Sequence, residues 1–423
     1  MHVKRWLLLL ILGIVLISLG AAYVLVNIYR EAPLPFFFTY LTLQFVPRIY
    51  RAILFALIGI GIVGTAIVQL NRSLLSAFVT EGDILVDAIY RRRQLTRGPK
   101  VVAIGGGTGL SNLLRGLKEY TGNLTAVVTV ADDGGSSGRL RTELGILPPG
   151  DFRQCIVALS DVEPLMTKLF QYRFQEGSGL EGHSFGNLFI AAMMGVTGDF
   201  EHALRESSRV LATRGQILPS TLSNVTLTAE LTGGSIVKGE SSIGHSGKRI
   251  ERVFLQPDRV AAYPAAVRAI EDADLVILGP GSLYTSVLPN LLVDGIRAAV
   301  KSTNATVVYV CNVAVEPGET DNYTVGQHLE TIERYIGGGT VDYVLANEHR
   351  GRPLPPQALA TIVSVNGSTQ TTVGPRLVKA DVIDPHNARH HDSTRLAESI
   401  MKLFYDRGAD RTLRVAPPSK GDS

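Results

Sequence analysis

The chain is poor in cysteine and has a small net charge. Its 423 residues include only two cysteines, Cys155 and Cys311, which excludes a disulfide framework and a cysteine metal cluster and suits a reducing compartment. Only 19% of the residues are charged and the formal net charge is +3, so nucleic acid is not an implied partner. An apolar content of 45% is typical of a folded protein with a sizeable core, and this length corresponds to two or three units.

Two long runs without any charge lie near the N-terminus, at residues 6–28 and 53–70. A helix that rises about 1.5 Å per residue crosses a hydrocarbon core of roughly 30 Å in about 20 residues. We therefore expect residues 1–71 to form a hairpin of two transmembrane helices. The alternative for the first run is a cleaved signal peptide, because Lys4 and Arg5 precede it and small residues occupy positions 20–22.

Basic residues lie outside both runs. Lys4 and Arg5 precede the first run, and five basic residues follow the second between positions 91 and 100, although the intervening loop also carries three arginines. Basic flanks mark the cytoplasmic side of a membrane protein. This predicts a multi-pass protein of the cell membrane whose main domain lies in the cytoplasm. Residues 72–99 are expected to form a helical linker beside the membrane.

Between residues 100 and 408, short apolar runs alternate with helix-patterned stretches. This pattern predicts a Rossmann-like α/β fold, a mostly parallel sheet with helices on both faces. Residues 221–240 depart from it, because two β-rich segments joined by Gly233 and Gly234 indicate a β-hairpin insertion. The polar tail at residues 409–423 is expected to be disordered. Ligands of parallel sheets bind at the carboxyl ends of the strands, so candidate site residues should follow the apolar runs.

The first such position is VVAIGGGTGLS at residues 101–111, a strand followed by a glycine turn and a helix start. Glycine has no Cβ, so backbone amides can approach an anion closely, and the N-terminus of a helix favours negative charge. We expect this turn to bind a nucleotide or phosphorylated ligand through Gly105, Gly106, Gly107, Thr108 and Gly109. The alternative is a tight turn that serves packing alone.

A second glycine turn follows the strand-like run DLVILGP, and its candidate ligand residues are Gly279, Gly281 and Ser282. Two such turns in one sheet rarely arise by chance. Asn312 and Asn347 end the next two strand-like runs. Asparagine at a strand end can read the hydroxyl or base edges of a ligand or can simply form a turn, and both roles remain open.

A glycine-rich loop with acids and hydroxyls, ADDGGSSGRLR, spans residues 131–141. The adjacent carboxylates of Asp132 and Asp133 could hold a divalent cation such as Mg²⁺, and Ser136, Ser137 and Arg139 suit phosphate oxygens. The alternative is a solvated loop in which one aspartate caps the next helix.

The segment GHSFGNL at residues 182–188 marks another helix start. His183 is expected to cap the helix or serve the structure, because a lone histidine more often does so, whereas Asn187 is the better ligand candidate.

Taken in order, IGGGTGLSNLLRGLK, VTVADDGGSSGRLR, GHSFGNL, GPGSLYTSVLPNLLV and EPGETD resemble the gluconeogenesis factor family (YvcK/CofD-like). That family is similar in turn to 2-phospho-L-lactate transferase. The resemblance covers residues 100–405 and not the apolar N-terminal runs. It implies a Rossmann-like fold and, for the gluconeogenesis factor branch, a UDP-sugar ligand such as UDP-N-acetylglucosamine. It also implies a role in cell shape and envelope-precursor supply during gluconeogenic growth.

Three functions remain open. We favour a membrane-anchored, nucleotide-sugar-binding regulator that forms homo-oligomers, because no nucleophile and base pair is evident and no catalytic residue can be assigned. The second is a phosphotransferase that uses a divalent metal to move a phospholactyl-type group from a guanosine diphosphate conjugate to a deazaflavin alcohol. The third is an NAD(P)-dependent oxidoreductase with an aspartate of the 131–141 loop on the ribose, which leaves the second glycine turn unexplained.

Overall fold

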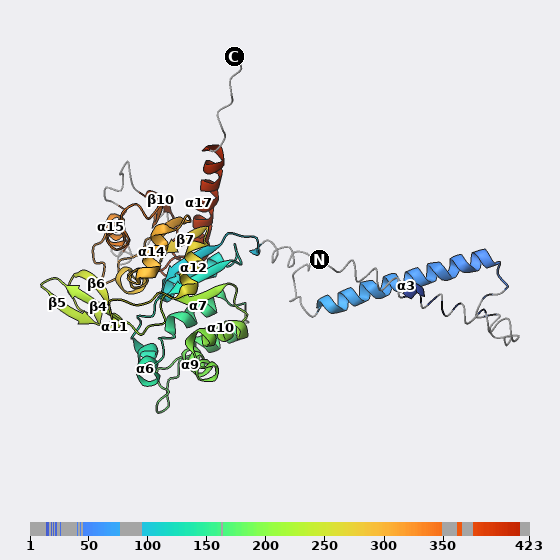
Figure 1. Ribbon diagram of the computed structural model, residues 1–423, viewed down its shortest axis with the longest axis horizontal. Coiled ribbons are helices and arrows are strands. Elements are labelled where there is room, and N and C mark those ends of the chain that lie inside the picture. The colour runs from blue at the N-terminus through green and yellow to red at the C-terminus, as the bar shows by residue number, and fades with distance from the viewer. Residues whose placement is uncertain are drawn as a thin grey trace, which may run out of the picture. The chain divides into compact units, whose positions relative to one another are not determined.

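The computed structural model describes residues 45–76, 95–161, 164–348, 362–365 and 375–414, together with scattered positions before residue 45. The chain divides into two compact units, Met1–Ala88 and Ile89–Ser423 (Figure 1). Most of the first predicted span, residues 6–28, lies outside the described residues, as do residues 77–94 of the predicted linker.

The first unit contains the helix α3 (Arg48–Ser76), which includes the second predicted span. Its apolar side chains are exposed, among them Ile60 at 70% and Leu57 at 63%. Among the described residues, none of the helices combines the length and the apolar content that a membrane crossing requires. The structure therefore does not support the predicted transmembrane hairpin.

A seven-stranded sheet forms the centre of the second unit. Its strands are β1 (Val101–Gly105), β2 (Leu124–Val128), β3 (Gln216–Pro219), β7 (Leu275–Leu278), β8 (Thr306–Val310), β9 (Tyr343–Asn347) and β10 (Arg376–Ala380). All neighbours pair in parallel, in the order β10-β9-β8-β7-β1-β2-β3. Strands covered on both faces are continuous apolar runs, as VVAIG, LVIL and TVVYV are. The α/β prediction is confirmed.

The order in which successive strands join the sheet reverses beside β1. From β1 the chain proceeds to β2 and β3 at one edge, then returns to β7 on the other side of β1 and continues outward to β10. Gly105 pairs with Val128 of β2, and Ile104 pairs with Leu278 of β7. Ligands of open parallel sheets bind at such a reversal, outside the carboxyl ends of the strands. The fold thus directs attention to the loops that follow β1 and β7.

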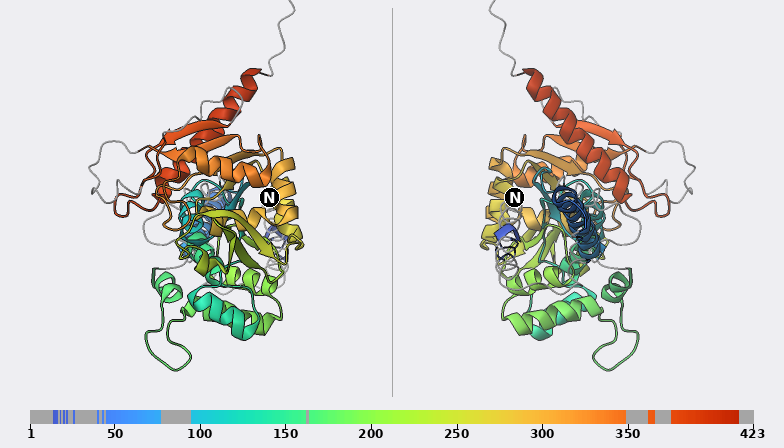
Figure 2. Two further views of the ribbon diagram at one scale, coloured as in Figure 1. Left: turned by 90° about the vertical axis from the view of Figure 1, so that its left-hand side faces the viewer. Right: turned by 90° about the vertical axis from the view of Figure 1, so that its right-hand side faces the viewer.

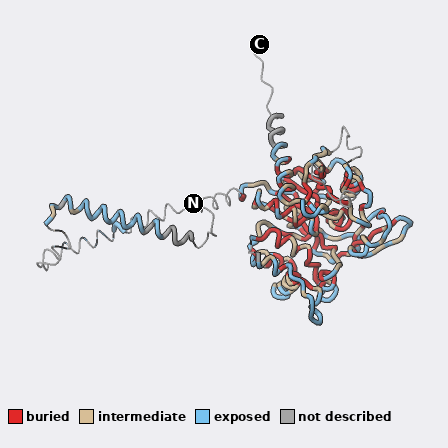
Figure 3. Tube along the Cα trace, turned by 180° about the vertical axis from the view of Figure 1, so that it is seen from behind, coloured by how far each residue is buried: buried red, intermediate tan, exposed pale blue. Residues whose placement is uncertain are grey.

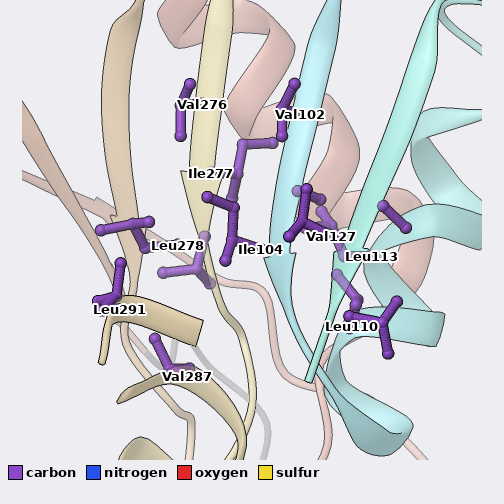
Figure 4. Packing of buried hydrophobic residues seen from close by; sticks show 14 of the residues in the cluster. Val102, Ile104, Leu110, Leu113, Val127, Val276, Ile277, Leu278, Val287 and Leu291 are labelled. Atoms are coloured by element: carbon purple, nitrogen blue, oxygen red, sulfur yellow. The ribbon is translucent and has the colours of Figure 1, made fainter. Parts of the chain in front are cut away.

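Helices cover both faces of the sheet. One group comprises α5 (Gly107–Leu117), α7 (Gly150–Leu159) and α17 (Ser393–Arg414), and a second comprises α12 (Pro264–Glu271), α14 (Asp294–Ser302) and α15 (Val325–Ile336). Leu110 and Leu113 of α5 pack with the buried strand residues Ile104 and Val127 (Figure 4). The helix α17 runs to Arg414, six residues past the predicted domain end at residue 408.

The predicted hairpin is part of a larger antiparallel sheet. Its strands are β4 (Thr226–Leu231), β5 (Ser235–Lys238) and β6 (Ile250–Gln256), in the order β5-β4-β6. The hairpin of β4 and β5 is confirmed, whereas β6 was not predicted. A short helix, α11 (Glu240–Ile243), follows β5. Four further helices lie at one end of the unit: α6 (Gly135–Leu144), α8 (Pro164–Gln171), α9 (Phe185–Thr197) and α10 (Phe200–Val210) (Figure 2).

Candidate functional site

The two glycine turns lie backbone against backbone at the sheet reversal. The first joins β1 to α5, and the second leads from β7 into a π-helical turn, Leu283–Val287, and the helix α13 (Leu288–Leu291). A Cβ on Gly109 would lie 2.7 Å from the carbonyl oxygen of Pro280, so only glycine permits this approach. Gly279 has a φ of +81°. These glycines therefore serve packing and turn shape as well as any ligand.

The turns enclose one side of a cavity of about 210 Å³. Its walls come from four segments of the chain. The lining residues are Gly106, Gly107, Thr108, Gly109, Asn112, Pro280, Gly281, Ser282, Ser286, Asn312, Val313, Glu316, Arg389, His390 and His391. The structure thus brings together most of the residues predicted in the two turns, and Asn312 with them. Gly105 and Gly279 lie at the adjoining strand ends.

Three basic residues that sequence analysis missed as site residues, Arg389, His390 and His391, line this cavity. Within the described part of the chain, no carboxylate lies at ion-pair distance from the Arg389 guanidinium, although Arg389 lowers the pKa of nearby Glu316, which burial raises. His391 is buried with its Nε2 3.2 Å from the Cys311 carbonyl oxygen, and burial lowers its pKa to about 4. The basic run before the last helix was the available signal.

Amides of both turns already have acceptors. The Asp151 carboxylate accepts a hydrogen bond from the Gly107 amide, and a Cβ on Gly106 would lie 2.5 Å from Asp151 Oδ2. Burial, and next the repulsion from Asp132, raise the pKa of Asp151 to about 7. The Gly281 amide donates to Asn312 Oδ1 at 3.1 Å. Asn312 therefore fixes the second turn while it lines the cavity.

Carboxyl groups from distant segments gather beside the first turn. Burial and repulsion from Asp132 raise the pKa of Glu240 to about 8, and burial raises the pKa of Glu319 to about 7. Burial also raises the pKa of Asp132 itself. Glu240 is the first residue of α11, which follows the antiparallel strand β5, and sequence analysis did not identify it as a site residue. Such mutual repulsion is typical of groups that face a cation or share protons.

The two aspartates of the predicted metal pair, Asp132 and Asp133, accept hydrogen bonds from different parts of the chain. Asp133 Oδ1 accepts the amide of Ser241 at 2.9 Å and thereby holds the start of α11. Asp132 Oδ1 accepts the amide of Gly134 at 2.9 Å. Across the residues that the structure describes, no three His, Cys, Asp or Glu side chains are arranged to hold a metal ion. A magnesium site on this pair stays a prediction.

Ser136 is the centre of a buried hydrogen-bond network. Its Oγ lies 3.0 Å from Nδ1 of His183 and accepts from Nδ2 of Asn187 at 3.1 Å. Asn187 Oδ1 in turn accepts from Arg153 Nε at 2.9 Å. Because Ser136 accepts from Asn187, its own proton is free for His183 Nδ1, and burial lowers the pKa of His183 in keeping with a neutral ring.

The other predicted phosphate ligands of the 131–141 loop also contact the protein. Ser137 Oγ accepts the amide of Gly150 at 3.1 Å, and Arg139 donates to the carbonyl oxygen of Glu181 at 2.8 Å. The loop therefore ties α6 to its neighbours, and its role in ligand binding stays a prediction.

Two glycine turns at the point where the strand order of a parallel sheet reverses, beside a cavity that basic side chains help to line, define a Rossmann-like α/β protein. A family model described as 2-phospho-L-lactate transferase CofD matches residues 101–382. The gluconeogenesis factor of Bacillus subtilis is 54% identical over 59% of this chain and 78% of its own length. The chain belongs to this CofD-related gluconeogenesis factor family.

Two further relatives extend the comparison. A protein of the same family name from Clostridium acetobutylicum is 43% identical over 96% of this chain and 91% of its own. A crystal structure from Bacillus halodurans, 46% identical, superposes with a TM-score of 0.69 and covers 72% of this chain and 100% of the other. The crystallised relative therefore aligns over its whole length with 72% of this chain.

Proposed function

We propose that the chain binds a nucleotide-diphosphate sugar of the UDP-N-acetylglucosamine type in the cavity between the two glycine turns. The presence of Arg389 and His390 in the same cavity as both turns carries this proposal. Arg389 makes no ion pair among the described residues and lines the same cavity as the start of α5, so it suits a phosphate group. The protein then acts in gluconeogenic growth, to which the printed name of the Bacillus subtilis relative points, and in our proposal it is a non-catalytic regulator of cell shape and envelope-precursor supply.

A second candidate is a metal-dependent phosphotransferase, which the CofD family model and the gathered carboxyl groups favour. Asp132 and Asp151 would hold Mg²⁺ together with phosphate oxygens of the ligand, since Mg²⁺ commonly uses one or two carboxylates and substrate phosphates. The ion would neutralise charge on the transferred group. In this reading a guanosine diphosphate conjugate replaces the uridine sugar.

Membrane attachment through the first unit belongs to the same proposal. The exposed apolar side chains of α3 support it, and the Clostridium acetobutylicum relative aligns over nearly the whole chain. Flotation of the full chain with lipid vesicles, beside residues 89–423 alone, tests it. Equal behaviour of both proteins contradicts attachment through this unit.

Calorimetric titration of the full chain, beside residues 89–423, which form a compact unit, tests the ligand. UDP-N-acetylglucosamine is compared with guanosine nucleotides and NAD, each with and without magnesium. We expect selective binding of the uridine sugar without turnover. No binding at millimolar ligand overturns the proposal. Preference for a guanosine nucleotide with magnesium, followed by turnover, establishes the transferase instead.

A further inference from the structure

One acidic side chain lines the cavity that we propose for phosphate groups. Glu316 belongs to the segment after β8 and lies among the residues that enclose this cavity. The strands that lead into the cavity walls, β1, β7 and β8, are buried in the interior of the second unit (Figure 3), and burial raises the pKa of Glu316. A carboxylate repels phosphate, so it opposes ligand binding unless the ligand also carries groups that the carboxylate binds.

The backbone of Glu316 is held by the turn in which it lies, whereas its side chain is not. The Glu316 amide donates to Thr320 Oγ1 at 2.9 Å, and the Glu316 carbonyl oxygen accepts the Thr320 amide at 2.9 Å. Within the described part of the chain, the Glu316 carboxylate accepts no hydrogen bond and forms no ion pair. The side chain therefore contributes little to the fold, and both of its oxygens are available to a ligand.

Positive charges beside Glu316 argue against a metal ion as its partner. Burial raises the pKa of Glu316, and the charges of Arg389 and His390 oppose that rise, so both lie near the carboxylate. Arg389 would repel a divalent cation bound there. Hydroxyl groups carry no net charge, and the two oxygens of a carboxylate can accept hydrogen bonds from two adjacent hydroxyls. Paired hydroxyls therefore suit the carboxylate and its cationic neighbours together.

We infer that Glu316 binds a vicinal diol of the ligand and thereby selects a sugar that is joined to phosphate. The inference rests on the proposed function, because it leaves Arg389 and the two turns to the phosphates of the same ligand. Both the ribose and the hexose of a nucleotide-diphosphate sugar carry such a diol. In dinucleotide sites of Rossmann folds an acidic residue binds the ribose hydroxyls. The aspartates after β2, Asp132 and Asp133, accept backbone amides in this chain, and Glu316 supplies the free carboxylate instead.

Calorimetric titration of the full chain in EDTA tests this role with UDP-N-acetylglucosamine and with inorganic diphosphate, which has no hydroxyls. Glu316→Ala should weaken binding of the sugar roughly tenfold to 100-fold, because hydrogen bonds to a charged group are lost. It should strengthen binding of inorganic diphosphate about twofold, because a repulsive charge is removed. Glu316→Gln keeps one acceptor and should bind the sugar with intermediate affinity. Glu271→Ala is the matched control, since it removes an exposed carboxylate at the end of α12, outside the cavity.

Two further probes, UDP and the 2′-deoxyuridine analogue of the sugar, distinguish the two diols. If Glu316 binds the ribose, the analogue should bind the wild type about tenfold more weakly than the parent sugar. Glu316→Ala should then weaken UDP as much as UDP-N-acetylglucosamine. If Glu316 binds the hexose, the analogue should bind like the parent sugar, and Glu316→Ala should leave UDP unaffected. Either result supports the inference.

Opposite responses of the sugar and of inorganic diphosphate to Glu316→Ala support a diol at this carboxylate. Equal responses, or none, overturn the inference and leave the proposed ligand unaffected. Affinity that magnesium raises in the wild type but not in Glu316→Ala assigns the carboxylate to a metal ion and also overturns it. If guanosine diphosphate binds in place of the uridine sugar, the proposed function fails, and guanosine diphosphate and its 2′-deoxy analogue then decide the role of Glu316. Binding of neither nucleotide overturns both.

Discussion

The turn after β1 and the loop after β2 look alike in sequence but differ in what their polar groups contact. Both are rich in glycine and carry hydroxyl groups at a strand end. Around the first turn, Thr108 and Arg389 line an open cavity. In the 131–141 loop, Ser136 and Ser137 are buried and bonded to the protein. Composition therefore predicts a ligand site at both segments. Only the hydrogen-bond partners distinguish the turn, which lines a cavity, from the loop, whose hydroxyl groups bond to other parts of the protein.

Asp151 connects the two regions, and its replacement should give the largest effect. Its carboxylate accepts the Gly107 amide of the turn and is repelled by Asp132 of the loop. Because the folded-state pKa of about 7 lies above the ordinary carboxyl pKa of an aspartate, about 3.8, folding favours the protonated form. This contribution to stability is full below the unfolded pKa and is lost as the pH rises through 7. Asp151 alone should lower the free energy of unfolding by roughly 2–3 kcal/mol between pH 5 and pH 8.

Urea unfolding of residues 89–423 at several pH values measures this loss in the wild type and in Asp151→Asn. The amide keeps an acceptor for Gly107, so the variant should lack the part of the slope that belongs to Asp151. The carboxyls of Glu240 and Glu319 act in the same direction, and His391 acts in the opposite direction below its unfolded pKa. The contributions of Glu319 and His391 cancel in the difference between the proteins, whereas Glu240 adds to the difference because Asp151 raises its pKa. Asp258→Asn, on an exposed loop, is the control. Parallel slopes in wild type and Asp151→Asn would contradict the burial of an ionisable carboxyl here.

Arg389 lines the cavity, and its replacement should lower ligand affinity while leaving the stability of the fold nearly unchanged. Arg389→Ala removes a charge-assisted hydrogen bond to phosphate, for which about 2 kcal/mol is a typical contribution. The affinity for UDP-N-acetylglucosamine should fall roughly 30-fold by calorimetry. The midpoint of thermal unfolding should change little, because the guanidinium has no carboxylate partner among the described residues.

Arg376→Ala provides the control, since Arg376 is exposed on the edge strand β10 and does not line the cavity. Equal affinity of wild type and Arg389→Ala would remove the main support for diphosphate binding between the turns.

The sequence predicted the parallel sheet because its strands are uninterrupted apolar runs, and it predicted both glycine turns because each follows such a run. It could not pair those turns, since β1 and β7 are separated by 169 residues and become neighbours only through the strand order. Arg389 was missed for the same reason. It approaches the cavity only when α17 packs against α5.

The roles of individual polar residues were harder still to predict. Asp133 and Ser136 have the chemistry of ligand residues, and sequence carries no information on whether a nearby amide or imidazole already satisfies them. Asp133 holds α11 through a residue 108 positions away. Glu240 reaches the acidic group only because an antiparallel sheet folds beside the cavity. The local sequence pattern predicts a strand or a turn, whereas the hydrogen-bond partners of a side chain depend on how distant elements are arranged in the fold.

Ser136→Ala should have the smallest effect and sharpens the comparison most directly. Removal of the hydroxyl leaves His183 Nδ1 and Asn187 Nδ2 without their buried partner, which should cost about 1–2 kcal/mol of unfolding free energy. We expect affinity for UDP-N-acetylglucosamine to stay within twofold, because these groups contact one another. Ser282→Ala, at the cavity wall, should show the reverse: reduced affinity with unchanged stability. If Ser136→Ala instead weakens binding tenfold while stability holds, the loop after β2 is part of the ligand site, and its hydrogen bonds rearrange when the ligand enters.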